Sequence, residues 1–346
     1  MVDGDELPLC KTLSGGTTPR SPSARVDPSR QPKIAMDILS ETSFDFLGPL
    51  TRGKVRDIYD QGDKLVLITT DRHSSFDRII AHIPWKGQVL NQVSAWWFEK
   101  TKDIVPNHVL AIPDPNVTIA KKCALVPIEA VVRGYLTGVT DTAIWTRYGK
   151  GQRDFGGVVL PDGMRKNQKL PQPIFDPTTK EAQHDRALTA DQLIAEGFVT
   201  AALFDRVRDT ALALFSRGQQ LAARNGLILV DTKYEFGLAE DGALVLIDEI
   251  HTPDSSRYWQ LDSYQARFAS GEEPHYFDKE FLRLWFIAHS DPYRDAALPA
   301  APPELVEELS RRYIAMYEQI TGTKFEFGAM PILPRIERNL KSAKQE

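Results

Sequence analysis

Several features are scarce in this chain of 346 residues, and each scarcity excludes a class of protein. The two cysteines, Cys10 and Cys123, are too few for a disulfide framework and lack a metal-binding spacing, which is typical of a reducing compartment. No apolar run approaches the roughly 20 residues that span a bilayer, and the first residues lack the apolar core of a signal peptide. The formal net charge of −5 argues against a nucleic acid or an anionic membrane as the main partner. We therefore expect a cytoplasmic protein in which any basic site is local.

The distribution of residue types along the chain indicates an α+β fold in two domains. Residues 1–37, rich in Ser, Pro, Gly and Arg, are predicted to be a disordered tail. Predicted strands dominate the next third, and a helix, a hairpin and further helices follow, which is not a regular βαβ alternation. We expect an N-terminal α+β domain over 38–125 and a C-terminal α+β domain over 126–346, with the ligand site in the cleft between them.

Local patterns predict the individual elements. Helical periodicity and end signals predict helices over 90–103, 200–224, 278–289 and 303–321. A strand is predicted over 123–138, where Pro127 suggests an edge position or a bulge. The segment 150–190 is rich in Gly, Pro and polar residues, so we expect a long functional loop there.

The stretch "LILVDTKYEFGLAEDGALVLIDEI", residues 227–250, places charged side chains inside two apolar runs. The first run alternates with period two. One predicted face therefore carries Leu227, Leu229, Asp231, Lys233 and Glu235. A charged row thus continues an apolar one on the same face of the predicted strand.

The turn of this hairpin determines which charges face one another. Asp241-Gly242 signals a two-residue turn, which pairs Glu235 with Asp248 across the ladder. A four-residue loop would instead place Asp248 opposite Lys233 and make Glu235 a diagonal neighbour. Both registers keep the charged side chains on one face.

Two carboxylates that face each other are destabilising unless a cation lies between them. Lys233 is one candidate for that cation, and Mg²⁺ is the other. A buried salt-bridge cluster is the structural alternative, although its desolvation is poorly repaid by pairing. Oxygen ligands without Cys or His favour a hard cation, and Mg²⁺ on one or two carboxylates commonly completes its shell with nucleotide phosphates. The hairpin therefore predicts a metal site at Glu235 and Asp248 beside an ATP site.

Other polar groups are candidates for binding anions. In "RGKVRD", 52–57, Gly53 lies between cations, so backbone amides with Lys54 and Arg56 could surround a phosphate, and a surface turn is the structural alternative. Further candidates follow apolar strands, namely Arg72, Ser74, Asp77, Arg133, Ser256 and Arg257. The first three also fit the start of a capped helix, and Arg133 also fits a structural salt bridge.

Six sequence blocks together resemble one known family. They are "GKVRDIYD", "TTDRHSSFD", "VPIEAVVRGYLTG", "PQPIFDPTTKEAQHD", "LVDTKYEFGL" and "DEIHTPDSSRYW". Their order and spacing are similar to the SAICAR synthetase (phosphoribosylaminoimidazole-succinocarboxamide synthase) family over residues 44–335. The resemblance implies a carbon–nitrogen ligase of purine biosynthesis that uses ATP and Mg²⁺ to join L-aspartate to carboxyaminoimidazole ribonucleotide (CAIR), giving SAICAR, ADP and phosphate. It also implies two α+β domains that resemble ATP-grasp enzymes.

The resemblance implies a role for each matching position. ATP would contact Gly53, Lys54, Arg56, the segment from Leu125 to Glu129, and Lys180. The metal carboxylates would be Glu235 and Asp248, and Asp231 and Lys233 would hold the imidazole end of CAIR. The anionic groups of CAIR would bind Arg133 and Arg257, with Arg72, Ser74, Asp77 and Ser256 as further substrate-binding residues.

Two positions depart from the family pattern. Val139 stands where many members have a serine that touches the CAIR phosphate, and Thr137 or Thr140 are possible substitutes. Asp176 stands where a threonine is common. The alternatives that remain open are a related ATP-dependent ligase with another carboxylate substrate and a catalytically silent nucleotide-binding protein. No general base is assigned, and the oligomeric state is left open.

Overall fold

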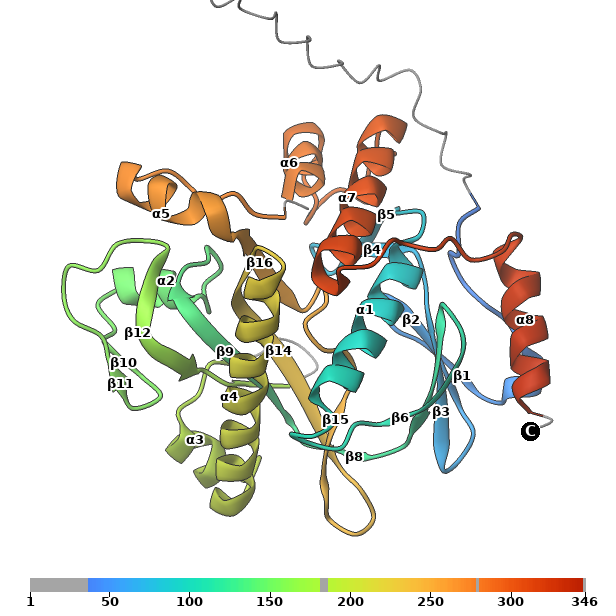
Figure 1. Cartoon of the computed structure of the whole chain (residues 1–346), viewed down its shortest axis with the longest axis horizontal. Coiled ribbons are helices and arrows are strands. Elements are labelled where there is room, and N and C mark those ends of the chain that lie inside the picture. Colours follow the sequence, from blue (N-terminus) through green and yellow to red (C-terminus); the bar gives the residue numbers. More distant parts are fainter. Residues whose placement is uncertain (1–36, 181–185, 278–279, 345–346) are drawn as a thin grey trace, which may run out of the picture. The chain divides into compact units, whose positions relative to one another are not determined.

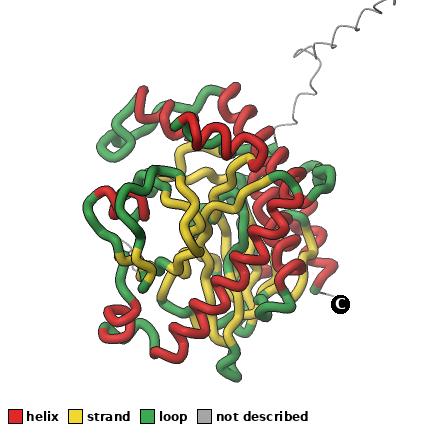
Figure 2. The backbone as a smooth tube through the Cα atoms, turned by 60° about the vertical axis from the view of Figure 1, so that its left-hand side comes forward, coloured by secondary structure: helices red, strands yellow, loops and turns green. Residues whose placement is uncertain are grey.

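The computed structural model describes residues 37–180, 186–277 and 280–344. All but the last residue of the predicted tail therefore lies outside the described chain. Residues 36–346 form one compact unit of mixed helices and sheets, so the α+β prediction is confirmed. Figure 2 shows the strands gathered in the interior of this unit, with helices on their outer faces.

An antiparallel five-stranded sheet is built from the first third of the unit. Its strands, in the order β1-β2-β3-β7-β6, are β1 (Leu50–Arg52), β2 (Arg56–Asp60), β3 (Lys64–Thr69), β7 (Val117–Lys121) and β6 (Val109–Asp114). The inward side chains of this sheet pack on α8, and Leu47, Tyr59, Ile68, Ile336 and Leu340 share one apolar core there. The C-terminal end of the chain therefore completes the core of its N-terminal third (Figure 1).

A second, seven-stranded sheet carries most of the predicted site residues. Its strands are β8 (Ala124–Leu125), β9 (Ile128–Leu136), β12 (Gln168–Phe175), β13 (Thr178–Thr179), β14 (Leu227–Leu238), β15 (Leu244–Ile247) and β16 (Ser256–Gln260). The long strand β14 pairs with four of the others, β8, β9, β15 and β16. Polar side chains on β14 therefore lie between neighbours from several distant parts of the chain.

Two small hairpins and the helices complete the unit. The hairpins are β4 (Arg72–Ser75) with β5 (Arg78–His82) and β10 (Asp154–Phe155) with β11 (Val158–Val159). The helices are η2 (Asp45–Leu47), α1 (Lys86–Thr101), α2 (Ile144–Gly149), α3 (Ala190–Ala195), α4 (Ala201–Arg224), α5 (Leu261–Ser270), α6 (Glu280–His289), α7 (Pro303–Thr321) and α8 (Ile332–Ala343). Within the described residues, no helix is long and apolar enough to cross a membrane.

Helix α4 shows why the longest predicted element was correct. Its buried side chains recur at helical spacing and pack on β14 and β9. Thr200 caps its first turn by accepting a hydrogen bond from the backbone of Leu203, and Gly226 follows its end with a φ of +72°. Gly322 ends α7 in the same left-handed conformation, as the sequence predicted.

Several other element predictions need correction. Pro127 does interrupt the predicted strand 123–138, but β9 lies between β12 and β14 in the sheet interior and not at an edge. The segment 69–80 forms the β4–β5 hairpin instead of a capped helix, with Asp77 in the left-handed region of its turn. The described part of the predicted loop 150–190 contains four strands, two of which, β12 and β13, find their partner in β9, more than twenty residues away.

The predicted division at residues 125 and 126 stays a prediction. The change from one sheet to the other falls between β7 and β8, close to that point. However, α7 packs on α1, and α8 packs on β6, so the C-terminal segment contributes to both halves of the unit.

Candidate active site

The central strand β14 changes the direction of its side chains midway. A register shift between Leu229 and Asp231 interrupts its pairing with β16. Leu229 lies against Gly218 of α4 together with His251, and the hydroxyl of Tyr234 is 2.6 Å from Nε2 of the same His251. Leu229 and Tyr234 therefore lie on one side, although the uninterrupted alternation predicted opposite faces. The charged row of β14 continues the face of Val230 instead of that of Leu229.

The hairpin register is also different from both predicted registers. Glu235 pairs with Ile247, and Ala239 with Ala243, so the loop holds three residues. This register alone would turn Asp248 away from Glu235. Asp248, however, follows the last residue of β15 and has a φ of +68°, so the ladder no longer determines where its side chain points. The predicted cluster forms through this backbone turn and not through cross-strand pairing.

Lys233 lies at the centre of a partly buried ionic cluster. Its Nζ is 2.9 Å from Oε1 of Glu129 and 2.8 Å from Oε1 of Glu235. Lys180 pairs with the other oxygen of Glu235. Burial by itself would lower the pKa of Lys233, but the carboxylates of Glu235, Asp248 and Glu129 outweigh burial and raise it. Lys233 is therefore a permanent cation in this cluster.

Arg56 joins the five-stranded sheet to the same cluster. It pairs with Asp248, and its Nη2 is 3.8 Å from Oε2 of Glu249. Burial opposes ionisation of Asp248, yet Arg56, Lys233 and Lys180 lower the pKa of Asp248 to about 2. Burial and the neighbouring Asp248 raise the pKa of Glu249 above its usual range. The structure thus adds Glu249, which the sequence analysis did not select although it follows Asp248 directly.

The predicted phosphate loop is a tight turn whose backbone is held by Arg72. The amide of Gly53 donates to the carbonyl of Arg56 at 2.8 Å. Arg72 is buried, and its guanidinium donates to the carbonyls of Gly53 and Lys54 and to Asp57. In this structure Arg72 therefore holds the loop, and its predicted substrate contact stays a prediction.

The exposed side of the phosphate loop meets the tip of the β4–β5 hairpin. Nζ of Lys54 is 2.6 Å from Oδ1 of Asp77, and both side chains are exposed. Ser74 is half-buried on β4. These three side chains therefore lie outside the ionic cluster around Lys233, on the solvent side of the loop.

The segment from Leu125 to Glu129, which the family resemblance assigns to ATP binding, runs along β14. Leu125 is exposed on β8 and pairs with Gly237, and the amide of Val126 donates to the carbonyl of Phe236. The side chain of Glu129, in contrast, points to Lys233 and also lies 3.5 Å from Oγ1 of Thr178. Glu129 thus belongs to the ionic cluster through its carboxylate.

A second group of charges surrounds Asp231. On one side β9 places Arg133 opposite it, and on the other β16 places Arg257 opposite it. Nη1 of Arg257 is 3.1 Å from Oδ2 of Asp231, and Nε of Arg133 is 2.5 Å from Oδ2 of Asp176. Ser256 on the same strand is 2.7 Å from the hydroxyl of Thr232.

This second group borders a cavity of about 230 Å³. Its lining includes Asp231, Ser255, Ser256, Arg257 and Tyr258. The turn that carries these serines is anchored by Asp254, whose carboxylate is 2.8 Å from the buried Nζ of Lys86 and accepts from Tyr313 at 2.6 Å. Of the two predicted substrate arginines, Arg257 therefore lines a preformed space, and Arg133 lies across Asp231 on β9.

The family departure at Val139 receives no compensation from Thr137. The hydroxyl of Thr137 is buried and lies 2.7 Å from Oδ1 of Asn167. Val139 and Thr140 are exposed, so Thr140 is the hydroxyl of the two that a ligand can reach.

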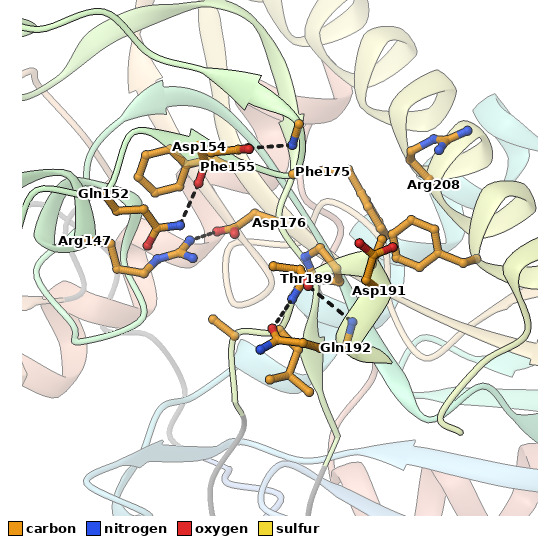
Figure 3. A pocket seen from close by; sticks show the side chains of 17 residues that line it. Arg147, Gln152, Asp154, Phe155, Phe175, Asp176, Thr189, Asp191, Gln192 and Arg208 are labelled. Carbon is orange, nitrogen blue, oxygen red and sulfur yellow. Dashed lines mark hydrogen bonds and ion pairs between the residues drawn. The ribbon is translucent and has the colours of Figure 1, made fainter. Parts of the chain in front are cut away.

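A larger cavity of about 660 Å³ is lined by Asp176 and Arg147, among others (Figure 3). Asp176 is buried and pairs with Arg147 as well as with Arg133. The guanidinium of Arg147 also lies over the ring of Phe155, 5.1 Å from its centroid. Arg147 has no distinctive sequence context, so only its contact with Asp176 identifies it.

His184 and His251 are the histidines nearest to the predicted site residues in the sequence, and neither is assigned as a general base. His184 lies outside the described residues. His251 is completely buried, and burial lowers its pKa to about 3. In the described part of the chain, no group of three or more His, Cys, Asp or Glu side chains forms a metal site by itself.

Known proteins similar to this chain belong to one family. The family model for SAICAR synthetase matches residues 49–299. A phosphoribosylaminoimidazole-succinocarboxamide synthase of Legionella pneumophila (strain Paris) is 55% identical over 305 residues, which cover 88% of this chain and 97% of that protein. The chloroplastic synthase of Arabidopsis thaliana is 58% identical over 294 residues, covering 84% of this chain and 72% of that protein.

Solved structures give the same result. The SAICAR synthase of Saccharomyces cerevisiae, complexed with SAICAR, has a TM-score of 0.71 at 33% identity and covers 84% of this chain and 100% of that one. A SAICAR synthetase in complex with ADP has a TM-score of 0.61 at 25% identity and covers 81% of this chain and 100% of that one.

Proposed function

This chain belongs to the SAICAR synthetase family and is a carbon–nitrogen ligase that joins L-aspartate to CAIR with ATP, and we propose that both charged groups on β14 form its active site. The observation that carries the proposal is that one strand brings together an ionic cluster for the nucleotide and, at Asp231, a cavity with Arg257 in its lining for the ribotide. Phosphoryl transfer between two bound anions requires both to be held close together and neutralised.

The nucleotide half of the site is assigned to the ionic cluster. The turn at Gly53 with Lys54 and Arg56 would surround the phosphates, and the exposed edge at Leu125 would border the adenine. Lys180 reaches the cluster from β13's end and already neutralises a carboxylate of Glu235. The solved complex of a SAICAR synthetase with ADP supports a nucleotide site in this fold.

Mg²⁺ is proposed at Glu235 and Asp248, and the residues present fit a hard cation. Among the described residues, the cluster holds four carboxylates, those of Glu129, Glu235, Asp248 and Glu249, and three cations, those of Arg56, Lys180 and Lys233. This excess of negative charge would repel a polyphosphate unless a further cation enters with it. Mg²⁺ would supply that charge and polarise the transferred phosphoryl group.

The ribotide half is assigned to the cavity beside Asp231. Arg133 and Arg257 would bind the anionic groups of CAIR, and Ser256 would add a hydroxyl. Asp231 and Lys233, neighbours on one face of β14, would hold the imidazole end next to the nucleotide. The carboxylate of CAIR would then lie between the two halves.

The reaction then follows from the juxtaposition. The carboxylate of CAIR is a poor acylating group, so it first takes the terminal phosphoryl group of ATP, giving an acyl phosphate and ADP. The amine of L-aspartate attacks the acyl carbon, phosphate leaves, and an amide is formed. The permanent cations Lys233 and Arg56 stabilise the negative charge that gathers during the first step.

The test is a direct measurement of ligation. Purified protein is given Mg·ATP and CAIR, with and without L-aspartate, and ADP and SAICAR are followed together. SAICAR that depends on aspartate and equals ADP in amount would support the proposal. ADP without SAICAR would indicate another amine acceptor, and ATP binding without turnover would favour a silent nucleotide-binding protein.

A further inference from the structure

We propose that Arg147 is a positioning residue for CAIR binding, because it takes up the charge of Asp176 and so keeps Arg133 available to the substrate. The inference rests on the proposed role of Arg133. It adds a residue from α2 that touches neither the ribotide cavity nor the ionic cluster of the nucleotide half.

The first step is the shared carboxylate. Oδ2 of Asp176 accepts from Nε of Arg133 at 2.5 Å and from Nη2 of Arg147. Asp176 is 6% exposed, and the side chains of Arg133 and Arg147 are 11% and 15% exposed, so water screens these charges weakly. A carboxylate that binds two guanidiniums attracts each of them less than it would attract one alone.

The second step is the balance of charge in two groups of ion pairs, Arg133 and Arg147 with Asp176, and Arg257 with Asp231. Three cations, Arg133, Arg147 and Arg257, face two carboxylates, Asp176 and Asp231. The two other carboxylates that line the ribotide cavity are already paired, Asp254 with Lys86 at 2.8 Å and Glu280 with Arg283. Without Arg147 the remaining two arginines would be fully matched by two carboxylates, and an anionic ligand would have to displace Asp176 from Arg133.

The third step concerns how Arg147 itself is held. Its guanidinium packs on Phe155, and its Nε is buried without a hydrogen-bond partner among the described residues. Figure 3 shows the side chain directed at Asp176 on the wall of the larger cavity. Within the described chain, Asp176 is thus the carboxylate with which Arg147 forms its ion pair.

The experiment is a charge-balance cycle. Arg147→Gln should raise the KM for CAIR about tenfold and leave the KM for ATP within about twofold. Asp176 would then hold Arg133 more tightly, and CAIR would lose its charge-assisted hydrogen bond with Arg133. Asp176→Asn should leave the KM for CAIR at or below the wild-type value. The double variant Arg147→Gln/Asp176→Asn should return it to within about threefold of wild type, because Arg133 again lacks a competing carboxylate.

The control is Arg153→Gln. Arg153 lies in the same segment and pairs with Asp162 and the ring of Tyr148, but it does not contact Asp176, so the KM for CAIR should not change. The inference is overturned if Arg147→Gln has no effect on this KM. It is equally overturned if the double variant is as impaired as Arg147→Gln, because Arg147 would then support local packing only.

Direct binding keeps this test separate from the proposed function. Calorimetry of CAIR with the same four variants and wild type reports the charge balance without turnover. A wild-type protein that binds CAIR but forms no SAICAR would contradict the proposed function and leave the cycle informative. A wild-type protein that does not bind CAIR would contradict both.

Discussion

The two halves of the site differ in the sign of their excess charge. In the described residues, the nucleotide half has four carboxylates against three cations, whereas the ion pairs of Asp176 and Asp231 in the ribotide half hold three arginines against two carboxylates. The first half therefore favours an added cation, and the second favours an added anion. Both are carried by β14, with Lys233 and Asp231 separated by one residue.

This difference explains how an acidic protein can bind two phosphorylated substrates. The net charge of −5 gives no general attraction for anions, so the attraction has to be local and largely shielded from water. The ribotide half attracts its ligand with its own arginines. The nucleotide half instead requires ATP to arrive with a metal ion, which links metal binding to nucleotide binding.

The largest effect is expected from removing a carboxylate of the nucleotide half. Glu235→Gln and Asp248→Asn should each lower kcat by about a hundredfold or more, because the cation that accompanies ATP loses a ligand. SAICAR formation measured over a range of Mg²⁺ concentrations checks this. Glu337→Gln, an exposed change on α8, is the control, and circular dichroism verifies the fold. Near-wild-type activity in both variants would refute the metal assignment.

The next effect should separate the two halves. Arg257→Met should raise the KM for CAIR roughly tenfold or more and leave the KM for ATP nearly unchanged, because one charge-assisted contact is worth about 1.5–3 kcal/mol. Steady-state kinetics with each substrate varied in turn measures the split. Arg224→Met, at the exposed end of α4, is the matched control. A rise in the KM for ATP equal to that for CAIR would contradict the assignment of Arg257 to one half.

A pH effect on stability is expected from His251, the buried histidine that contacts Tyr234 of β14. The pKa of His251 is lowered by burial from its usual value of 6.5 to about 3, so between pH 7 and pH 5 the unfolded chain binds a proton that the folded His251 does not. The free energy of unfolding therefore decreases as the pH is lowered, by roughly 2 kcal/mol between pH 7 and pH 5. Urea unfolding of wild type and His251→Gln at both pH values should show this loss in the wild type and a smaller loss in the variant.

Other buried groups also contribute to the change in stability between pH 7 and pH 5, and their contributions must cancel in that comparison. Burial lowers the pKa of His108 to about 4, and burial raises the pKa of Asp71 to about 6. Both are present in wild type and variant, so the difference between the two proteins reports His251 alone. Equal losses in the two proteins would mean that His251 is not buried in its neutral form.

The smallest effect is expected at the exposed pair on the phosphate loop. Lys54→Met should change the free energy of unfolding by less than about 1 kcal/mol, because both Lys54 and Asp77 are exposed and their pairing is screened. The same variant should raise the KM for ATP a few-fold. Thermal melting and ATP titration measure the two quantities, and a large loss of stability with an unchanged KM would reverse this interpretation.

Local sequence was sufficient where local chemistry decides the structure. The periodic apolar residues of α4, its Thr200 cap and the glycine that ends it all act within a few residues, and the predicted helix 200–224 is observed almost residue for residue. The charged row of β14 was likewise visible as a pattern. The α+β class and the family follow from residues that the sequence displays directly.

Only the tertiary structure decided how those charges are paired. A single bulge after Leu229 and a three-residue turn reversed the predicted faces, because one residue of slip moves every side chain of a strand to the other side. The left-handed backbone at Asp248 then returned its carboxylate to the cluster. Arg147 meets Asp176 from 29 positions away. The sequence determined which charges are available, and packing across long separations determined their partners, since ion pairs depend on distances that no local pattern contains.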